Sequence, residues 1–563
     1  MKQKILFAFL LVITLSNISF ALETEPQEIT DAVKPESASQ NLPLEGAAKM
    51  ENVVNEEFTS PTELFSDQIS KYDASLNESN IYDLIFPKEN SLVLRKDYSA
   101  EGTDVVKPFF EAMERFSQSN VTVSYKNFEA LIDNNNLNDF YYMTLAYQMS
   151  DLGFFSLSEK AMAKVENREV WQSHIETIKR MYLPKNKLSH EEELFLANIY
   201  TSIIFNNLTR ESIQDVMKRD RLIRRSDYAN YLVANALFID KDYQKALSSI
   251  NRSLSSNSEN FYYINYKIKI LIELERYEEA LKLVSDLESK NILNPENIKD
   301  VEKQKYYLLS KSEKNEAKAK YYLANYFSLN NDYARAIKEL IPISYKTKTA
   351  EIPSLLGDIY FKTKDYPKAT ESYERALDIN KHCDSAYKGL ANISMLRKEY
   401  SLAEKNYLKA LKHNKYDENS LIGLSVINYL KNDQKIAKQY SDKALSVNPN
   451  CYKGYYLQSK YKQNKNISNL VSASILNPFF ANTWLDLADN SLLNKDTISA
   501  EKYLDSVKYL EDNNFRYYYY KGIIARLNKD SQTADSNFIK AVSLYTEKTG
   551  KSENIPVSQI KEN

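Results

Sequence analysis

Residues 353–377 read PSLLGDIYFKTKDYPKATESYERAL, and this stretch decides the fold of the chain. It predicts one helix, a tight polar turn and a second helix. Small side chains, at Gly357 and Ala369, stand where the two helices must touch, because helices approach closely only over small residues. Bulky side chains, at Leu356 and Tyr373, stand where the space between the helices must be filled. The stretch therefore predicts a helical hairpin with an apolar face that it cannot cover alone.

The hairpin recurs along the chain. The small residue that opens the second helix is found at Ala246, Ala280, Ala336, Ala369, Ala403, Ala437, Ala500 and Ala534. Successive gaps between these alanines are 34, 56, 33, 34, 34, 63 and 34 residues. A small residue of the first helix keeps step with them, at Ala234, Ala324, Gly357, Ala391, Ser425, Ser459, Ala488 and Gly522. A fixed period of this length indicates hairpins that stack, each covering the apolar face of its neighbour.

This period and its small–large pattern resemble the tetratricopeptide repeat family from about Asp227 to Tyr545. The resemblance implies an all-α, right-handed superhelical solenoid of helix–turn–helix repeats, with the first helix of each repeat on the concave side. Two stretches depart from the period. Residues 291–316 are an irregular helical insert, and the unit from Tyr452 to Phe480 is short, so we expect short helices in it.

The composition excludes several classes of protein. The chain has 563 residues, too many for one compact core. It contains only 9 Gly and 14 Pro, whereas strand-rich folds with many tight turns need more of both. Its net charge of −2 provides no bulk attraction to a polyanion, so we expect no nucleic-acid partner.

The amino-terminal residues 1–21 predict a signal peptide. Lys2 and Lys4 precede an apolar run, and a small-x-small cleavage site ends at Ala21. We expect cleavage after Ala21 and a periplasmic or extracellular protein. The alternative is a membrane anchor formed by residues 5–22.

Residues 22–104 predict a disordered, acidic linker, because they are polar and have no helical period. Within the linker, residues 81–87 (IYDLIFP) are an apolar island. The island is either a short segment packed on the first helices or a docking motif for a groove of this chain or of a partner. At the other end, residues 546–563 predict a disordered tail.

Residues 105–226 have helical periodicity but a poor repeat, which predicts degenerate hairpins stacked against the regular array of residues 227–545. Ser189 before Glu192 predicts a capping box at a helix start. The basic cluster at residues 218–225 is either a solvated helix face or a contact with an anionic polymer or membrane surface.

The chain has few of the residues that commonly act in catalysis, with only 2 Cys and 4 His. Cys383 and Cys451 are two periods apart, too far for a disulfide, so we expect two unpaired thiols. The adjacent His382, Cys383 and Asp384 point in different directions and lack a matching ligand pair elsewhere. We therefore expect no enzyme, no metal site and no cofactor. A hydrolase hidden in the irregular amino-terminal half would need a nucleophile–base pair that we do not find.

The resemblance assigns the inward-facing positions of the repeats to Tyr, Asn and Lys side chains. These ligand-groove candidates are Tyr228, Tyr231, Asn235, Tyr262, Asn265, Tyr266, Lys269, Tyr321, Tyr322, Asn325, Asp358, Lys388, Asn392, Lys453, Tyr456, Lys460, Arg516, Tyr519 and Tyr520. Tyr offers rigid apolar area with a polar tip, and Asn and Lys can hold backbone carbonyls, so such a groove suits an extended peptide. The alternative is that many of these tyrosines pack between units.

Some family members in chaperone adaptors hold two carboxylates with a clamp of Lys, Asn and Arg. Lys388, Asn392 and Lys453 match three of its positions, whereas Gly423 and Leu457 stand at the other two. Because the clamp's Arg is missing, we do not expect binding of chaperone tails. The expected function is an exported scaffold that binds an extended peptide or a partner helix in its concave groove. The alternative is a saccharide- or cell-wall-polymer-binding component of an envelope assembly or secretion complex.

Overall fold

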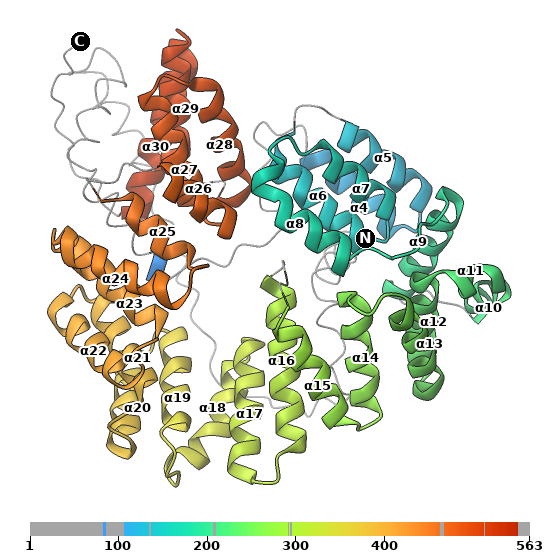
Figure 1. Ribbon diagram of the computed structural model, residues 1–563, viewed down its shortest axis with the longest axis horizontal. Coiled ribbons are helices and arrows are strands. Elements are labelled where there is room, and N and C mark those ends of the chain that lie inside the picture. Colours follow the sequence, from blue (N-terminus) through green and yellow to red (C-terminus); the bar gives the residue numbers. More distant parts are fainter. Residues whose placement is uncertain are drawn as a thin grey trace, which may run out of the picture. The chain divides into compact units, whose positions relative to one another are not determined.

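The computed structural model describes residues 83–85, 106–133, 137–205, 210–290, 292, 295–461, 467–511 and 513–549, which form helices and no strand (Figure 1). The described residues divide into two compact units: unit 1 extends to Thr483, and unit 2 begins at Trp484. The predicted signal peptide, most of the linker and the end of the tail lie outside them. Among the described helices, none is both long and apolar enough to cross a membrane.

Helix pairs joined by short turns follow one another along unit 1. The pairs are α4 (Val106–Ser117) with α5 (Val121–Asp133), α6 (Asp139–Asp151) with α7 (Phe155–Lys164), α12 (Asp227–Ile239) with α13 (Tyr243–Ser256), α14 (Phe261–Glu273) with α15 (Tyr277–Glu288), α17 (Glu316–Leu329) with α18 (Tyr333–Ser344), α19 (Glu351–Lys362) with α20 (Tyr366–Ile379), α21 (Asp384–Leu396) with α22 (Tyr400–His413), α23 (Glu418–Leu430) with α24 (Gln434–Val447), and α25 (Tyr452–Ser459) with α26 (Ile467–Leu476).

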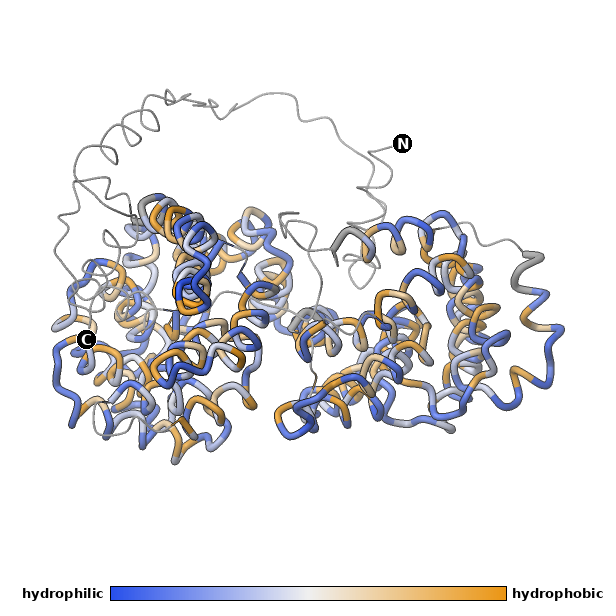
Figure 2. The backbone as a smooth tube through the Cα atoms, turned by 90° about the horizontal axis from the view of Figure 1, so that it is seen from above, coloured by the Kyte–Doolittle hydropathy of each residue, from blue (hydrophilic) through white to orange (hydrophobic). Residues whose placement is uncertain are grey.

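Five further helices belong to unit 1: α8 (Arg168–Met181), α9 (His190–Ile204), α10 (Arg210–Lys218), α11 (Asp220–Arg225) and α16 (Pro295–Ser312). Helix α27 (Ala481–Leu493) begins in unit 1 and continues into unit 2, which also holds α28 (Thr497–Leu510), α29 (Phe515–Leu527) and α30 (Ser531–Thr549). The helices carry hydrophobic and hydrophilic residues side by side, as Figure 2 shows, which is the pattern of helices that bury one face. The predicted all-α solenoid of helical hairpins is confirmed.

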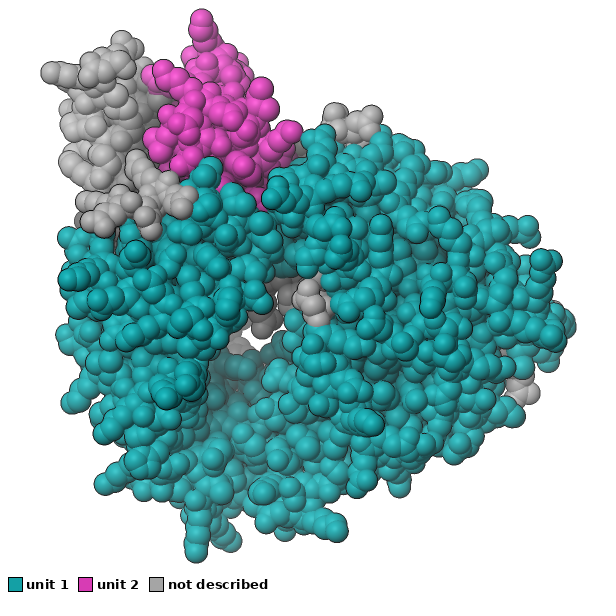
Figure 3. Space-filling view, viewed as in Figure 1, with its two compact units in different colours: residues 1–17, 81–483 teal, residues 18–80, 484–563 magenta. Residues whose placement is uncertain are grey.

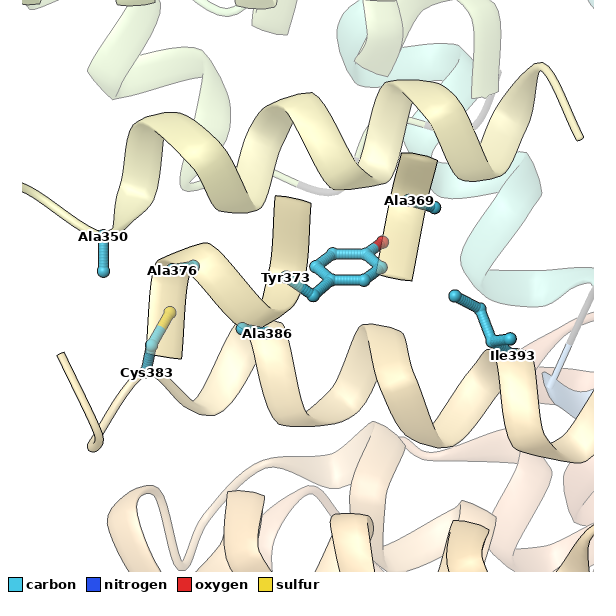
Figure 4. Packing of buried hydrophobic residues seen from close by; sticks show 7 residues of the cluster. All are labelled: Ala350, Ala369, Tyr373, Ala376, Cys383, Ala386 and Ile393. Atoms are coloured by element: carbon cyan, nitrogen blue, oxygen red, sulfur yellow. The ribbon is translucent and has the colours of Figure 1, made fainter. Parts of the chain in front are cut away.

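The small residues lie where paired helices touch. The eight alanines that open the second helices are at most 1% exposed. A Cβ atom on Gly357 would lie 2.6 Å from Cε1 of Tyr373, and one on Gly389 would lie 2.2 Å from Cζ of the same ring. Figure 4 shows this ring lying between neighbouring helices, with Ala369 and Ala376 close to it. The glycines therefore make room for a tyrosine that fills the space between two hairpins.

In the hairpins that carry the repeated alanine, the turn contains one residue in the left-handed region, five positions before that alanine. These residues are Lys241, Glu275, Asn331, Lys364, Lys398, Asn432, Lys495 and Lys529, with φ between 56° and 63°. At Lys364 the backbone N–H donates to Phe361 O (3.0 Å), and the N–H of Asp365 donates to Tyr360 O (2.9 Å), which is a Schellman motif. The Asp365 side chain then accepts from the N–H of Lys368 and caps the next helix.

The hairpins α4/α5 and α6/α7 have the same register and are more regular than the sequence pattern indicated. Ala112 and Ser124 stand 12 positions apart, as do Ala146 and Ser158, and all four are fully buried. That spacing separates the paired small residues of the later repeats, for example Ala391 and Ala403. In the first two hairpins serine replaces the second alanine. Further along, the predicted capping box of Ser189 and Glu192 is confirmed at the start of α9.

The two departures from the period have different structures. The insert contains α16, an 18-residue helix that packs on both α15 and α17 and so takes part in the stack. The short unit has helices of 8 and 10 residues, as predicted. Tyr461, which follows α25, packs against the preceding hairpin α23/α24: its hydroxyl lies 3.0 Å from Ser425 Oγ and donates to Ser441 Oγ at 3.3 Å. Cys383 and Cys451 are buried and unpaired, as predicted.

Helices from the two ends of unit 1 meet. Helix α26 contacts α8. The ring of Phe479, just after α26, lies 5.9 Å from that of Phe140 and 6.3 Å from that of His174, centroid to centroid. Burial lowers the pKa of His174 to about 4, so this imidazole is neutral at pH 7. Figure 3 shows unit 1 hollowed at its centre.

Candidate functional site

The first helices of several neighbouring hairpins touch one another in unit 1. Neighbouring first helices contact each other in four cases, α12 with α14, α17 with α19, α19 with α21 and α23 with α25, whereas the second helices of these hairpins make fewer mutual contacts. In a curved stack, the helices on the inner side lie closest together. We call the surface made by α12, α14, α17, α19, α21, α23 and α25 the inner wall.

Four of the predicted groove tyrosines gather at α12 and α14. The ring of Tyr231 stacks on that of Tyr228 with centroids 5.8 Å apart and meets the ring of Tyr266 edge-on at 5.5 Å. Tyr228 is buried, and Gly153 in the α6–α7 turn lies under its hydroxyl. Tyr231, Tyr262 and Tyr266 are only half-buried, so their rings reach the surface of the inner wall.

A carboxylate from outside the regular repeats joins these tyrosines. Asp151, the last residue of α6, accepts a hydrogen bond from the hydroxyl of Tyr262. Burial raises the pKa of Asp151 to about 7, while the Tyr262 hydrogen bond acts in the opposite direction. Its charge helps to raise the pKa values of Tyr200 and Tyr231, which places both near it. Asp151 and Tyr200 were missed because neither belongs to a repeated position.

Polar groups from α16 extend this part of the wall. Gln304 donates from Nε2 to Oδ1 of Asn265 at 2.5 Å, and both side chains are buried. Burial lowers the pKa of the half-buried Lys269, against the favourable charge of Asp300. The groove positions Asn265 and Lys269 are thus held by partners on a helix for which the repeat offers no template.

Two asparagines among the groove candidates are hydrogen-bonded within their own helices. Asn235 donates from Nδ2 to Tyr231 O at 2.7 Å, and Asn325 donates to Tyr321 O at 2.9 Å. Tyr321 and its neighbour Tyr322 are half-buried, with ring centroids 5.6 Å apart. The two rings continue the aromatic surface along α17.

Further along the wall, tyrosines of the second helices reach the first helices. The hydroxyl of Tyr373 donates to Asp358 at 2.7 Å, and one period later the hydroxyl of Tyr407 donates to Asn392 Oδ1 at 2.6 Å. Asp358 reaches solvent on the wall, yet the surrounding protein desolvates it and raises its pKa.

Three positions matched the two-carboxylate clamp, and two of them have partners inside the protein. Lys388 pairs with Asp417 at 3.2 Å, and Asn392 accepts from Tyr407. Lys453 is half-buried, and burial lowers its pKa. A carboxylate ligand would have to compete with Asp417 for the charge of Lys388, and the expectation that chaperone tails do not bind stays a prediction.

Two sets of groove candidates do not belong to the surface of the inner wall. Tyr456 is wholly buried, with its ring 5.0 Å from that of Phe480 and Lys460 above it, so its assignment to a ligand surface was wrong. It faces the core because α25 is short. Tyr519 and Tyr520 lie on α29 in unit 2, where Arg516 donates to Tyr520 and pairs with Asp486. Figure 3 shows unit 2 in magenta.

The His382 and Cys383 neighbourhood holds no group of three potential metal ligands, and the same is true throughout the described residues. His382 Nδ1 lies 3.0 Å from His413 Nδ1, and the pair is exposed. Asp384 instead accepts from Asn414 Nδ2 at 3.2 Å. The basic cluster at residues 218–225 is largely exposed, and its Arg225 pairs with Glu192 of α9.

Comparisons with known proteins bear on the repeats. Residues 354–383 match the family described as Tetratricopeptide repeat. The comparison with curated proteins gave no match. Similar solved structures include pilF of Pseudomonas aeruginosa (18% identity over 41% of this chain and 91% of that chain, TM-score 0.26). A second is YrrB, described as a TPR protein with an unusual peptide-binding site (16% identity over 38% and 91%, TM-score 0.21).

A third is the Cut9–Hcn1 hetero-tetramer of the APC/C (12% identity over 78% of this chain and 94% of that chain, TM-score 0.34). Proteins with such repeats are typically scaffolds rather than enzymes. The matched segment overlaps the stretch that decides the fold and extends six residues beyond it, and hairpins of the same register continue on both sides. Residues 354–383 therefore form a tetratricopeptide repeat, and the hairpins on both sides of it share its register.

Proposed function

We propose that this protein is an exported scaffold that binds a protein partner along the inner wall of unit 1. The observation that carries the proposal is the cluster of half-buried rings at Tyr231, Tyr262 and Tyr266 beside Asp151. An extended peptide or a helix laid on this wall would cover the rings. Export rests on the sequence of residues 1–21 alone.

The chemistry of the cluster suits a peptide. Tyrosine rings provide apolar contact area at low cost in side-chain entropy, and their hydroxyls pair with backbone groups. Asp151, ionised above its pKa of about 7, accepts from a peptide N–H or a cationic side chain. No observation favours the saccharide alternative, which stays a prediction.

Site-specific cross-linking tests the proposal. A photo-reactive phenylalanine analogue replaces Tyr266 or Tyr322 on the inner wall, and in a matched control it replaces Leu408, which is 45% exposed on the second helix α22. We expect one protein partner to be cross-linked in cells from both inner positions and not from position 408. Equal cross-linking of that partner from position 408, or its absence at both inner positions, would overturn the assignment.

A further inference from the structure

We propose that unit 1 has a second docking surface, at the start of α27, which takes a short helical turn with an acidic residue followed by leucine. In the structure the chain's own Asp83–Ile85 turn occupies it. A partner segment with the same chemistry would compete with that turn. This inference rests on the proposed function, to which it adds a site and a ligand class.

The Asp83–Ile85 turn packs against the rest of unit 1. Residues 83–85 are helical, and Leu84 is 0% exposed although the turn has only three described residues. Such a turn cannot bury a leucine by itself, so the rest of the protein must cover the side chain. In Figure 1 the short blue turn lies beside α25.

A polar contact fixes the position of the turn. Nδ2 of Asn482, the second residue of α27, donates to Oδ2 of Asp83 at 3.0 Å. Asn482 is itself 3% exposed, so this hydrogen bond is shielded from water. The charge of Asp83 also contributes to the raised pKa of Tyr452, at the start of α25. A leucine anchor, an acidic group and a buried amide donor together define the ligand chemistry.

The turn is not part of the hairpin stack. It lies 399 residues from Asn482 in sequence and is separated by 20 residues from α4, the first helix of the stack. The site also adjoins the short α25/α26 hairpin, in which the helices are shorter than in the other repeats. A covalently attached ligand is present at high effective concentration, so a weak contact is enough to keep it bound. A three-residue turn anchored by a leucine and an acidic side chain is correspondingly easy for a second segment to replace.

The test uses the full chain and a fluorescein-labelled peptide of residues 79–89 (SNIYDLIFPKE), followed by fluorescence anisotropy. The variant Leu84→Asp releases the internal turn, because a buried carboxylate at this position is unfavourable. We expect Leu84→Asp to bind the peptide at least tenfold more tightly than the unmodified chain does. Peptides carrying Asp83→Asn or Leu84→Asp serve as matched controls and should bind the variant at least fivefold more weakly.

A second variant locates the site. Asn482→Ala in the Leu84→Asp background should weaken binding of the natural peptide more than that of the Asp83→Asn peptide, because the two changes remove the same hydrogen bond. Circular dichroism confirms that each variant is folded; if Leu84→Asp unfolds, Asp83→Lys replaces it. Equal binding to the unmodified chain and the released variant, or no binding to either, overturns the docking surface. The cross-linking at Tyr266 and Tyr322 is independent of this result, so the failure of one proposal leaves the other measurable.

Discussion

The hairpins α6/α7 and α21/α22 have different small residues at the place where their paired helices touch. In α21/α22 the facing small residues are Ala391 and Ala403, both fully buried. In α6/α7 they are Ala146 and Ser158, and Ser158 Oγ donates to the Ala146 carbonyl at 2.6 Å. The close approach of the helices brings that carbonyl within reach, so the buried hydroxyl has its partner. The register of the hairpin is therefore set by side-chain size rather than by apolar character.

The largest loss of stability is expected when a large side chain replaces the small residue at the helix contact of either hairpin. Ser158→Leu and Ala403→Leu each insert a large side chain where the helices touch, and each should reduce the free energy of unfolding by about 3 kcal/mol. Urea unfolding, with hydrogen exchange to locate the loss, measures it. Leu408→Ala, on an exposed face of α22, is the control and should change stability by less than about 0.5 kcal/mol. A tolerated Ser158→Leu would show that the two hairpins are not equivalent.

The glycine–tyrosine contact of the regular repeats should have the next largest effect. In Gly389→Ala the new methyl group would lie 2.2 Å from Cζ of Tyr373, so the ring must move, at a cost of about 2 kcal/mol. Tyr373→Leu removes the obstacle. A double-mutant cycle should therefore show that Gly389→Ala costs at least about 1 kcal/mol less in the Tyr373→Leu background. Additive losses would contradict the contact.

Two carboxylates of the amino-terminal helices have pKa values that burial raises strongly. Burial raises the pKa values of Asp151 and Glu193 to about 7, with Tyr200, Tyr231 and Tyr262 around the first and Glu159 near the second. The folded protein keeps protons that the unfolded chain releases between pH 4 and 7, so these two groups lower stability as pH rises through that range.

Asp151→Asn removes one of these titrations. The variant should gain on the order of 1–2 kcal/mol over the unmodified protein at pH 8, and clearly less at pH 5, because the natural carboxyl is neutral there. Thermal unfolding at both pH values measures the difference. The opposite trend is expected from His174, whose pKa is lowered to about 4, so it destabilises the fold as pH falls below 6.5. An equal gain at both pH values would contradict the titration of Asp151.

Two tyrosines of successive repeats offer a finer comparison. Tyr373→Phe leaves the desolvated carboxylate of Asp358 without its donor, whereas Tyr407→Phe leaves the neutral amide oxygen of Asn392. Hydrogen bonds to charged groups contribute more, so the expected losses are about 1.5 and about 1 kcal/mol. Urea unfolding of both variants gives the order. The reverse order would indicate that Asp358 is protonated or well solvated in the folded protein.

The smallest effect is expected from Ser158→Ala. It converts α6/α7 to the alanine pattern of α21/α22 and removes one hydrogen bond, while the Ala146 carbonyl keeps its place in the helix. The expected loss is about 0.5 kcal/mol. Hydrogen exchange in α6 and α7 measures it, and Ala403→Ser provides the reciprocal change. A loss above about 2 kcal/mol would show that the hydroxyl, and not the size of the side chain, holds the hairpin together.

The repeats could be predicted because their signal is local. Gly357, Ala369 and Tyr373 lie within one hairpin, and the spacing of 12 between facing small residues follows from helix geometry. The hairpins α4/α5 and α6/α7 carried the same signal, hidden because serine stood in place of alanine. The left-handed turn residues could not be read in the same way, since Lys364 and its counterparts are mostly lysines rather than the glycine that usually marks this conformation.

The candidate site could be predicted only in part. The family pattern found Tyr231, Tyr262 and Tyr266, because inward-facing positions recur with the repeat. It misplaced Tyr456, which is buried where the repeat is short, and it had no means of finding Asp151. Where the chain departs from the repeat, a different side of a helix is covered by its neighbours. A pattern defined by the regular units does not predict which side is covered at these departures.

The amino-acid sequence by itself determined the hairpins, their period and the residues at which paired helices touch, because these depend on neighbours within about one repeat. Only the tertiary structure decided which tyrosines reach the wall of unit 1, that Asp151 meets Tyr262 across 111 residues, and that Asp83 meets Asn482 across 399. Such contacts depend on how small rotations between successive hairpins add up. The total rotation cannot be predicted from any single stretch of the chain.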